Sequence, residues 1–129
     1  MYSPSVRTWP LLGIIAAGWP SPAEEELLDK ISFDEWLIQD SSFMLKVTHS
    51  AMQDAGIHEN DIVIVQRGKQ PHGGDIVVAE IDSKWVLRYY QVEKGQIALY
   101  PANGMYEILR PEESLIVIGT VTACIRKYY

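Results

Sequence analysis

From Phe43 onward the chain is a series of short apolar runs rich in β-branched residues, and these runs constrain its fold more than any other feature. The run Ile62-Val-Ile-Val65 contains no polar residue, which is typical of a strand buried on both faces. Turn-forming residues such as Gly73-Gly74 separate the runs. Strands are expected at 43–47, 62–65, 76–81, 85–92, 96–100 and 115–126. The sequence therefore predicts a mainly β fold with short helices, and Gly119 is expected to form a bulge in the last strand.

Two short helices are expected before the β region. Ser21-Pro-Ala-Glu24 and Ser32-Phe-Asp-Glu35 each have the spacing of a capping box, in which the serine side chain accepts a hydrogen bond from a free backbone amide. We expect these helices to continue to about Leu28 and Ile38. A single helical turn at 51–55 should end at the glycine that follows it.

Length and charge limit the classes of function. The 129 residues are enough for one modest core, and we expect a flexible N-terminal arm at 1–10 and one domain at 11–129. The net charge is −6 with only 11 Lys and Arg, which argues against direct DNA binding because a nucleic-acid surface needs clustered cations. No apolar run is long enough to span a bilayer, and a secretory signal is not expected at 11–18.

Cysteine and histidine usage predicts neither a disulfide nor a metal site. The single cysteine, Cys124, cannot form an internal disulfide, which fits a reducing cytoplasmic location, and we expect it to be a small buried residue of a strand. The histidines, His49, His58 and His72, do not fall at the spacing of metal ligands. No metal and no cofactor is therefore expected.

Six segments follow one another in the order seen in a known family. They are 13–23, 43–57, 74–79, 84–90, 99–103 and 115–126. Together they resemble the LexA/UmuD family of self-cleaving Ser-Lys peptidases, also called S24. Pro20-Ser-Pro-Ala23 is more similar to the accessory branch of translesion polymerase V than to the repressor branch.

The resemblance implies a LexA-like C-terminal peptidase fold and assigns roles to individual residues. In Phe43-Met-Leu-Lys-Val-Thr-His-Ser-Ala-Met-Gln-Asp-Ala-Gly-Ile57, the nucleophilic serine position holds Ala51. In Lys84-Trp-Val-Leu-Arg-Tyr-Tyr90, the general-base lysine position holds Arg88. The cleavage segment lies within 11–23, and its scissile bond would join Ala17 to Gly18. Beside the nucleophile position, the pocket would include His49, Ser50 and Met52.

The two substitutions remove the chemistry that the family uses. A Ser-Lys dyad needs a hydroxyl to attack and a neutral lysine to accept its proton. Ala51 has no oxygen, and Arg88 stays protonated at any ordinary pH, so we expect an inactive peptidase. Ser50 is a poor substitute because adjacent side chains point in different directions, and it is better explained as a cap of the following turn. His49 stands where the family has glycine and would add bulk to the pocket.

If Arg88 points at the family's active site, it should be half-buried and should find a carboxylate or carbonyl partner there. If it lies exposed, it is an ordinary strand arginine.

By resemblance, this chain is a regulatory protein of the SOS response or an accessory subunit of a translesion polymerase. Its partners would then be the RecA filament and a Y-family DNA polymerase. Two alternatives stay open: a non-enzymatic β-fold interaction module unrelated to DNA damage, and a live hydrolase with a relocated nucleophile. Whether the two dyad substitutions are engineered or natural also stays open.

The last expected strand, 115–126, suggests a homodimer. Its alternating residues make both faces largely apolar. A terminal strand with two apolar faces and an open edge needs a cover, and proteins of the resembled family pair through this region. The alternative is an internal strand of a monomer.

Overall fold

The computed structural model describes residues 7–12, 15, 29–112 and 114–129. The chain forms two compact units, one at 1–38 and the other at 39–129. The boundary therefore falls inside the range expected to form one domain. The helix expected from Ser21 and the bond between Ala17 and Gly18 lie outside the described residues.

The described part of the first unit contains two short strands and one helix. β1, Trp9–Leu11, pairs antiparallel with β2, Asp29–Ile31. β1 begins within the expected N-terminal arm, and neither strand was expected because three residues are too few to show a period. α1, Phe33–Leu37, begins after Ser32, whose side chain accepts a hydrogen bond from the Glu35 amide at 3.4 Å. This contact confirms the predicted capping serine.

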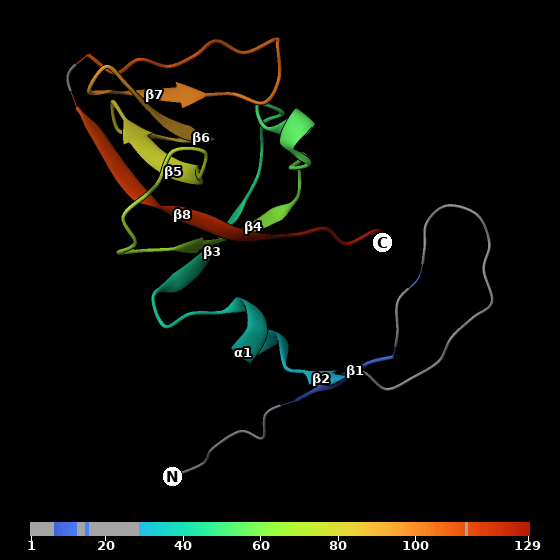
Figure 1. Ribbon diagram of the computed structural model, residues 1–129. Helices are drawn as coiled ribbons and strands as arrows, with labels where there is room; N and C mark the ends of the chain where they lie inside the picture. Colours follow the sequence, from blue (N-terminus) through green and yellow to red (C-terminus); the bar gives the residue numbers. More distant parts are fainter. Residues whose placement is uncertain (1–6, 13–14, 16–28, 113) are drawn as a thin grey trace. The chain divides into compact units, whose positions relative to one another are not determined.

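The second unit is a six-stranded antiparallel sheet with the strand order β3-β4-β8-β5-β6-β7 (Figure 1). Its strands are β3 Ser42–Lys46, β4 Ile62–Gln66, β5 Ile76–Ile81, β6 Lys84–Glu93, β7 Gln96–Tyr100 and β8 Leu115–Ile125. No bound differs from its expected position by more than one residue. The mainly β fold is confirmed.

Two tight turns set the register of β5, β6 and β7. Asp82 and Ser83 have φ angles of 49° and 66°, and Lys94 and Gly95 have φ angles of 51° and 76°. Each pair joins directly opposed strand ends, so both connections are two-residue hairpin loops. Positive φ at both central residues matches the right-handed twist of the flanking strands.

β8 joins two halves of the sheet. Its first half pairs with β5, from Leu115 opposite Ile81 to Thr120 opposite Val77. Its second half pairs with β4, from Thr120 to Ile125. The strand is therefore internal to the sheet, which corrects the expectation of a strand with one fully open edge. The pairings still leave one side of 121–125 without a ladder partner among the described residues.

Gly119 lies where the ladder between β8 and β5 shifts by one residue, which confirms the predicted bulge. A Cβ atom added to Gly119 would lie 2.6 Å from Val65 Cγ1 and 2.7 Å from the Gln66 carbonyl oxygen. Glycine is therefore required here because β4 passes too close for any side chain.

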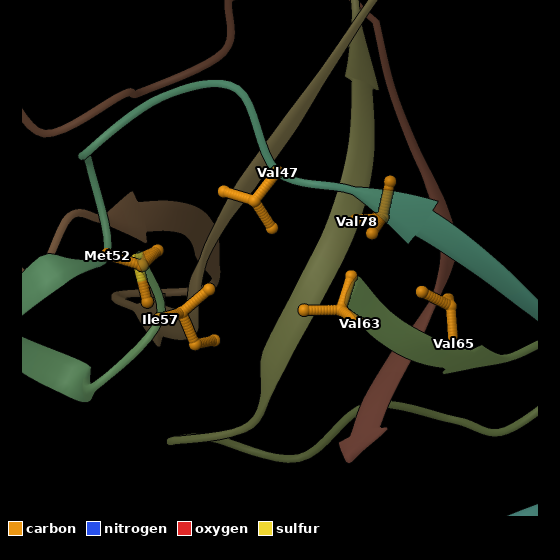
Figure 2. Close-up of a cluster of buried hydrophobic side chains, with 6 residues drawn as sticks. All are labelled: Val47, Met52, Ile57, Val63, Val65 and Val78. Atoms are coloured by element: carbon orange, nitrogen blue, oxygen red, sulfur yellow. The ribbon is translucent and has the colours of Figure 1, made fainter. Parts of the chain in front are cut away.

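The core has two clusters. The larger one contains Val47, Met52, Ile57, Val63, Val65 and Val78 (Figure 2). The other contains Val77, Ala79, Tyr90 and Leu99. Neighbouring residues of β5 belong to different clusters because strand side chains alternate between the two faces.

The link between β3 and β4 contains one helical turn, η1 Gln53–Ala55. It ends at Gly56, whose φ of 84° is the expected left-handed cap. Asn60, in the turn before β4, also has a positive φ, 74°.

Candidate functional site

A cavity of 590 Å³ lies between β3 and β6. It is lined by residues 45–49, 51–52 and 84–88, with Val63, Val78 and Tyr106. β3 and β6 are not neighbours in the sheet, yet the rings of Phe43 and Trp85 approach to 6.3 Å between centroids. The sheet therefore curls so that these two strands face each other and form opposite walls of the cavity.

Ala51, which occupies the expected nucleophile position, is held in a tethered segment. Its side chain is buried, with 2% exposure, and it lines the cavity. The Ala102 amide donates to the Ala51 carbonyl at 2.8 Å, and the Asn103 side-chain amide donates to the Ser50 carbonyl at 2.8 Å. The Asp54 amide donates in turn to the Ala102 carbonyl at 2.7 Å. The segment after β7 thus fixes the backbone on which Ala51 is carried.

Arg88, at the expected lysine position, lines the same cavity as Ala51. It is half-buried, and its Nη1 donates to the carbonyl of Leu87 at 2.8 Å. Its Nε is buried and has no hydrogen-bond partner among the described residues. The guanidinium carbon lies 5.6 Å from the centre of the Tyr106 ring. Burial lowers the pKa of Arg88, and Tyr106 opposes that shift, but an arginine keeps its proton at ordinary pH.

The other predicted pocket residues divide into those that line the cavity and one that does not. His49 is exposed and lines the rim, while Met52 is 1% exposed and belongs both to the core and to the lining. Ser50 is not among the residues that line the cavity. Its hydroxyl lies 3.4 Å from the Tyr106 hydroxyl instead, because neighbouring side chains along the segment point in different directions.

Ser50 was expected to cap the following turn, but its side chain does not do so. Its backbone carbonyl accepts from the Gln53 amide at 3.1 Å, and η1 has no side-chain cap.

Sequence reasoning missed three residues of the cavity. Lys46 and Lys84 are exposed at the lining, and Tyr106 reaches it from the segment between β7 and β8. Both lysines lie in segments that the family resemblance covers, but nothing in the sequence of those segments indicates that the two side chains share a cavity. Tyr106 follows the 99–103 segment, and only the folded chain brings it to Arg88.

Chemically, the cavity combines an apolar lining with cationic groups. It has no side-chain oxygen at Ala51, and the guanidinium of Arg88 is a donor that cannot accept a proton. The lining therefore presents aliphatic side chains beside two lysines and one arginine.

A buried ion pair closes the turn that follows η1. Asp61 is 1% exposed and accepts from Arg126 Nε at 2.8 Å and from Arg126 Nη2 at 2.7 Å. Arg126 Nη2 also donates to the Gly56 carbonyl at 2.7 Å. Hydrogen bonding to Arg126 holds the pKa of the Asp61 carboxyl well below its usual range, against the opposing effect of burial. The pair ties the end of β8 to the link between β3 and β4.

Cys124 also approaches this pair, with its Sγ 3.4 Å from Asp61 Oδ2. Cys124 is exposed, whereas the sequence had predicted a buried cysteine.

In the described ranges, His, Cys, Asp and Glu side chains form no group of three that could hold a metal ion. No helix within these ranges has the length and apolar character needed to cross a membrane.

Comparison with known proteins identifies relatives along most of the chain. Residues 10–122 match the family described as peptidase S24-like. The chain is 36% identical to the LexA repressor of Acetivibrio thermocellus over 119 residues, covering 92% of the chain and 56% of that protein. It is 38% identical to the LexA repressor of Mycolicibacterium smegmatis over 119 residues, covering 92% and 49%. It is 35% identical to protein SamA of Salmonella typhimurium over 113 residues, covering 86% and 79%.

The chain thus spans about half the length of the LexA repressors that it matches. The match extends from β1 into β8 and includes both walls of the cavity. The chain belongs to the LexA/UmuD-like S24 peptidase family.

Proposed function

We propose that this chain is a LexA/UmuD-like regulatory or accessory protein of the SOS response, and that its peptidase cleft binds polypeptide without cutting it. The family match and the names of its relatives, LexA repressor and SamA, support a regulatory or accessory role. The observation that carries the second half of the proposal is the chemical content of the cavity. A methyl group at Ala51 and a guanidinium at Arg88 line it together.

Neither half of dyad chemistry is available to these side chains. Attack on a peptide carbonyl needs an oxygen, sulfur or nitrogen nucleophile, and Ala51 supplies none. The proton of a serine hydroxyl would have to pass to a neutral base, and Arg88 is not one. Ser50, the nearest hydroxyl in sequence, is directed to Tyr106 and does not line the cavity.

Incubation at alkaline pH tests the absence of self-cleavage. High pH deprotonates a catalytic lysine and so accelerates dyad cleavage, which makes this a sensitive assay. We expect intact-mass spectrometry to show an uncut chain after prolonged incubation. A fragment that begins at Gly18 would refute the proposal, and its loss in a Ser50→Ala variant would identify Ser50 as a relocated nucleophile.

Restoring the dyad provides the matched positive control. Ala51→Ser alone should stay uncut because its hydroxyl would face a charged guanidinium. Ala51→Ser combined with Arg88→Lys should gain cleavage, since residues that act as one catalytic unit are not additive. Rapid cleavage by the single variant would mean that another base is present.

The proposed partners follow from the family. We expect the chain to bind the RecA filament and, as an accessory subunit, a Y-family DNA polymerase in the cytoplasm. Co-sedimentation with RecA filaments assembled on single-stranded DNA tests the first interaction, and free single-stranded DNA is the control. Failure to co-sediment would favour an interaction module unrelated to DNA damage.

The proposed homodimer uses the second half of β8. The side of 121–125 that faces away from β4 has no ladder partner among the described residues. Ile125 is 41% exposed at the end of this stretch, and Tyr128 and Tyr129 that follow it are exposed too. An antiparallel pairing of two such edges would be isologous and would cover both.

A further inference from the structure

The charge of the cleft differs from that of the chain as a whole. The chain carries 17 Asp and Glu against 11 Lys and Arg. The cavity between β3 and β6 is lined by Lys46, Lys84 and Arg88, and no Asp or Glu is among its described lining residues. Cations gathered in the hollow of an acidic protein create a local field that attracts anions.

Within the part of the chain that the structure describes, these three cations form no ion pair with a carboxylate. The ion pairs among the described residues join His72 to Asp75, Arg110 to Glu93 and Arg126 to Asp61. Lys46, Lys84 and Arg88 take part in none of them within the described ranges.

Arg88 in particular has unused binding capacity. A guanidinium has five N–H donors arranged to meet a carboxylate at two points. In Arg88 the described hydrogen bonds use Nη1 alone, on the carbonyl of the preceding residue, and Nε is buried without a partner. Its Nη2 is not among the buried atoms and takes part in no hydrogen bond of the described residues, so it can donate to an acceptor that enters the cleft.

The shape and remaining lining of the cleft indicate an extended peptide. The cavity of 590 Å³ is lined by aliphatic side chains such as Val47 and Leu87, and Trp85 stands at its side. β3, which forms one wall, is an edge strand among the described strands of the sheet, so none of them pairs with its outer backbone groups, which an added strand could use. In an extended peptide, alternate side chains point to opposite sides, so apolar and acidic residues can meet different parts of the cleft.

We propose that this cleft is a receptor for an extended acidic peptide of a partner protein, in which aliphatic side chains alternate with Glu or Asp. Arg88 pairs with a carboxylate inside the cleft, while Lys46 and Lys84 meet further carboxylates on the two opposing walls. The inference rests on the proposed role of the cleft in binding without cutting. It adds the chemical class of the ligand.

Fluorescence anisotropy with three octapeptides tests this inference. Each is acetylated, amidated and carries a neutral dye, and leucine alternates with glutamate, serine or lysine. We expect the glutamate peptide to bind at least about tenfold more tightly than the serine peptide, as several charge-assisted contacts would give. Binding should weaken as salt rises from about 0.05 to 0.5 M because screening lengths become short. Amidation removes the terminal carboxylate, so the response reports on side-chain carboxylates.

Substitutions locate the binding site. Arg88→Gln should weaken binding of the glutamate peptide by at least about fivefold, and the double variant Lys46→Gln with Lys84→Gln by a similar factor. Lys69→Gln, an exposed lysine outside the cavity lining, is the matched control and should leave the affinity unchanged. The two cleft lysines are exposed, so their variant keeps its fold even if Arg88→Gln does not.

The inference is overturned if the glutamate and serine peptides bind equally, if the double lysine variant binds as tightly as the parent, or if no peptide binds at millimolar concentration. Intact-mass spectrometry of the same samples distinguishes failure of this inference from failure of the proposed function. A cut chain refutes the proposed role. An uncut chain that binds the glutamate and serine peptides equally refutes the further inference alone, and an uncut chain that binds no peptide also refutes the proposed binding role of the cleft.

Discussion

Gly119→Ala should destabilise the sheet because the new methyl group has no room. The ideal Cβ position lies 2.6 Å from Val65 Cγ1 and 2.7 Å from the backbone oxygen of Gln66. A normal carbon contact is about 3.5–4.0 Å, so the overlap is of the order of an ångström. The Val65 side chain is fully buried, and the Gln66 carbonyl belongs to a paired strand, so neither can move away without loss of packing or of the ladder.

The size of the effect follows from these contacts. Overpacking of a filled core costs about 1–3 kcal/mol, and disruption of one ladder hydrogen bond about 1 kcal/mol more. The smaller entropy of an unfolded chain with alanine offsets about 0.5 kcal/mol. We therefore expect a loss of about 2–3 kcal/mol in the free energy of unfolding. With a urea slope near 1.5 kcal/mol/M, the midpoint should fall by about 1.3–2 M.

Urea denaturation followed by tryptophan fluorescence measures this shift. Gly104→Ala is the matched control, because Gly104 has no neighbour within 4 Å of an added Cβ and no positive φ. The control should stay within about 0.3 M of the parent midpoint. If Gly119→Ala were as stable as the control, the close approach of β4 to β8 would be wrong.

Three other changes have defined outcomes. Asp61→Asn should cost about 2 kcal/mol at pH 7, because the buried carboxylate accepts several hydrogen bonds. The folded-state pKa of Asp61 is depressed, so its contribution is present above the unfolded pKa near 4 and is lost as the pH falls further. Urea midpoints of parent and variant should converge in acid, and a difference that does not depend on pH would contradict this. Asn103→Ala should lower the free energy of unfolding by about 1–2 kcal/mol, because the Ser50 carbonyl loses its hydrogen bond from the Asn103 side chain. Backbone amides at 50–54 should then exchange their hydrogens faster, and an unchanged exchange rate would contradict this prediction. Ile125→Asp should convert the proposed dimer to a monomer by light scattering. Ile116→Asp, at a still more exposed isoleucine near the other end of β8, should not.

The strand pattern and its turns were predictable because they depend on neighbouring residues. Alternation and β-branched runs located β7 at 96–100 and β5 at 76–81 without error. Local chemistry also predicted the left-handed cap at Gly56. The bulge at Gly119 was predictable in position, but the sequence could not show that its cause is the proximity of Val65.

Several features depended on contacts between distant parts of the chain. The place of β8 inside the sheet could not be deduced from its apolar faces, because an internal strand and a dimer edge have the same composition. β1 and β2 were missed because each is only three residues long and their pairing joins segments about twenty residues apart. Ser50 was placed in the pocket by adjacency, whereas side-chain direction turned it toward Tyr106.

The sequence by itself determined the family and the chemistry that Ala51 and Arg88 can supply, since a methyl group and a guanidinium have the same reactivity in any fold. Only the tertiary structure brought those two side chains into one cavity with Tyr106, Lys46 and Lys84. That arrangement results from the curl of the sheet, which sets β3 against β6. Sheet curvature is a collective property of strand twist and packing, and no local pattern in the sequence encodes it.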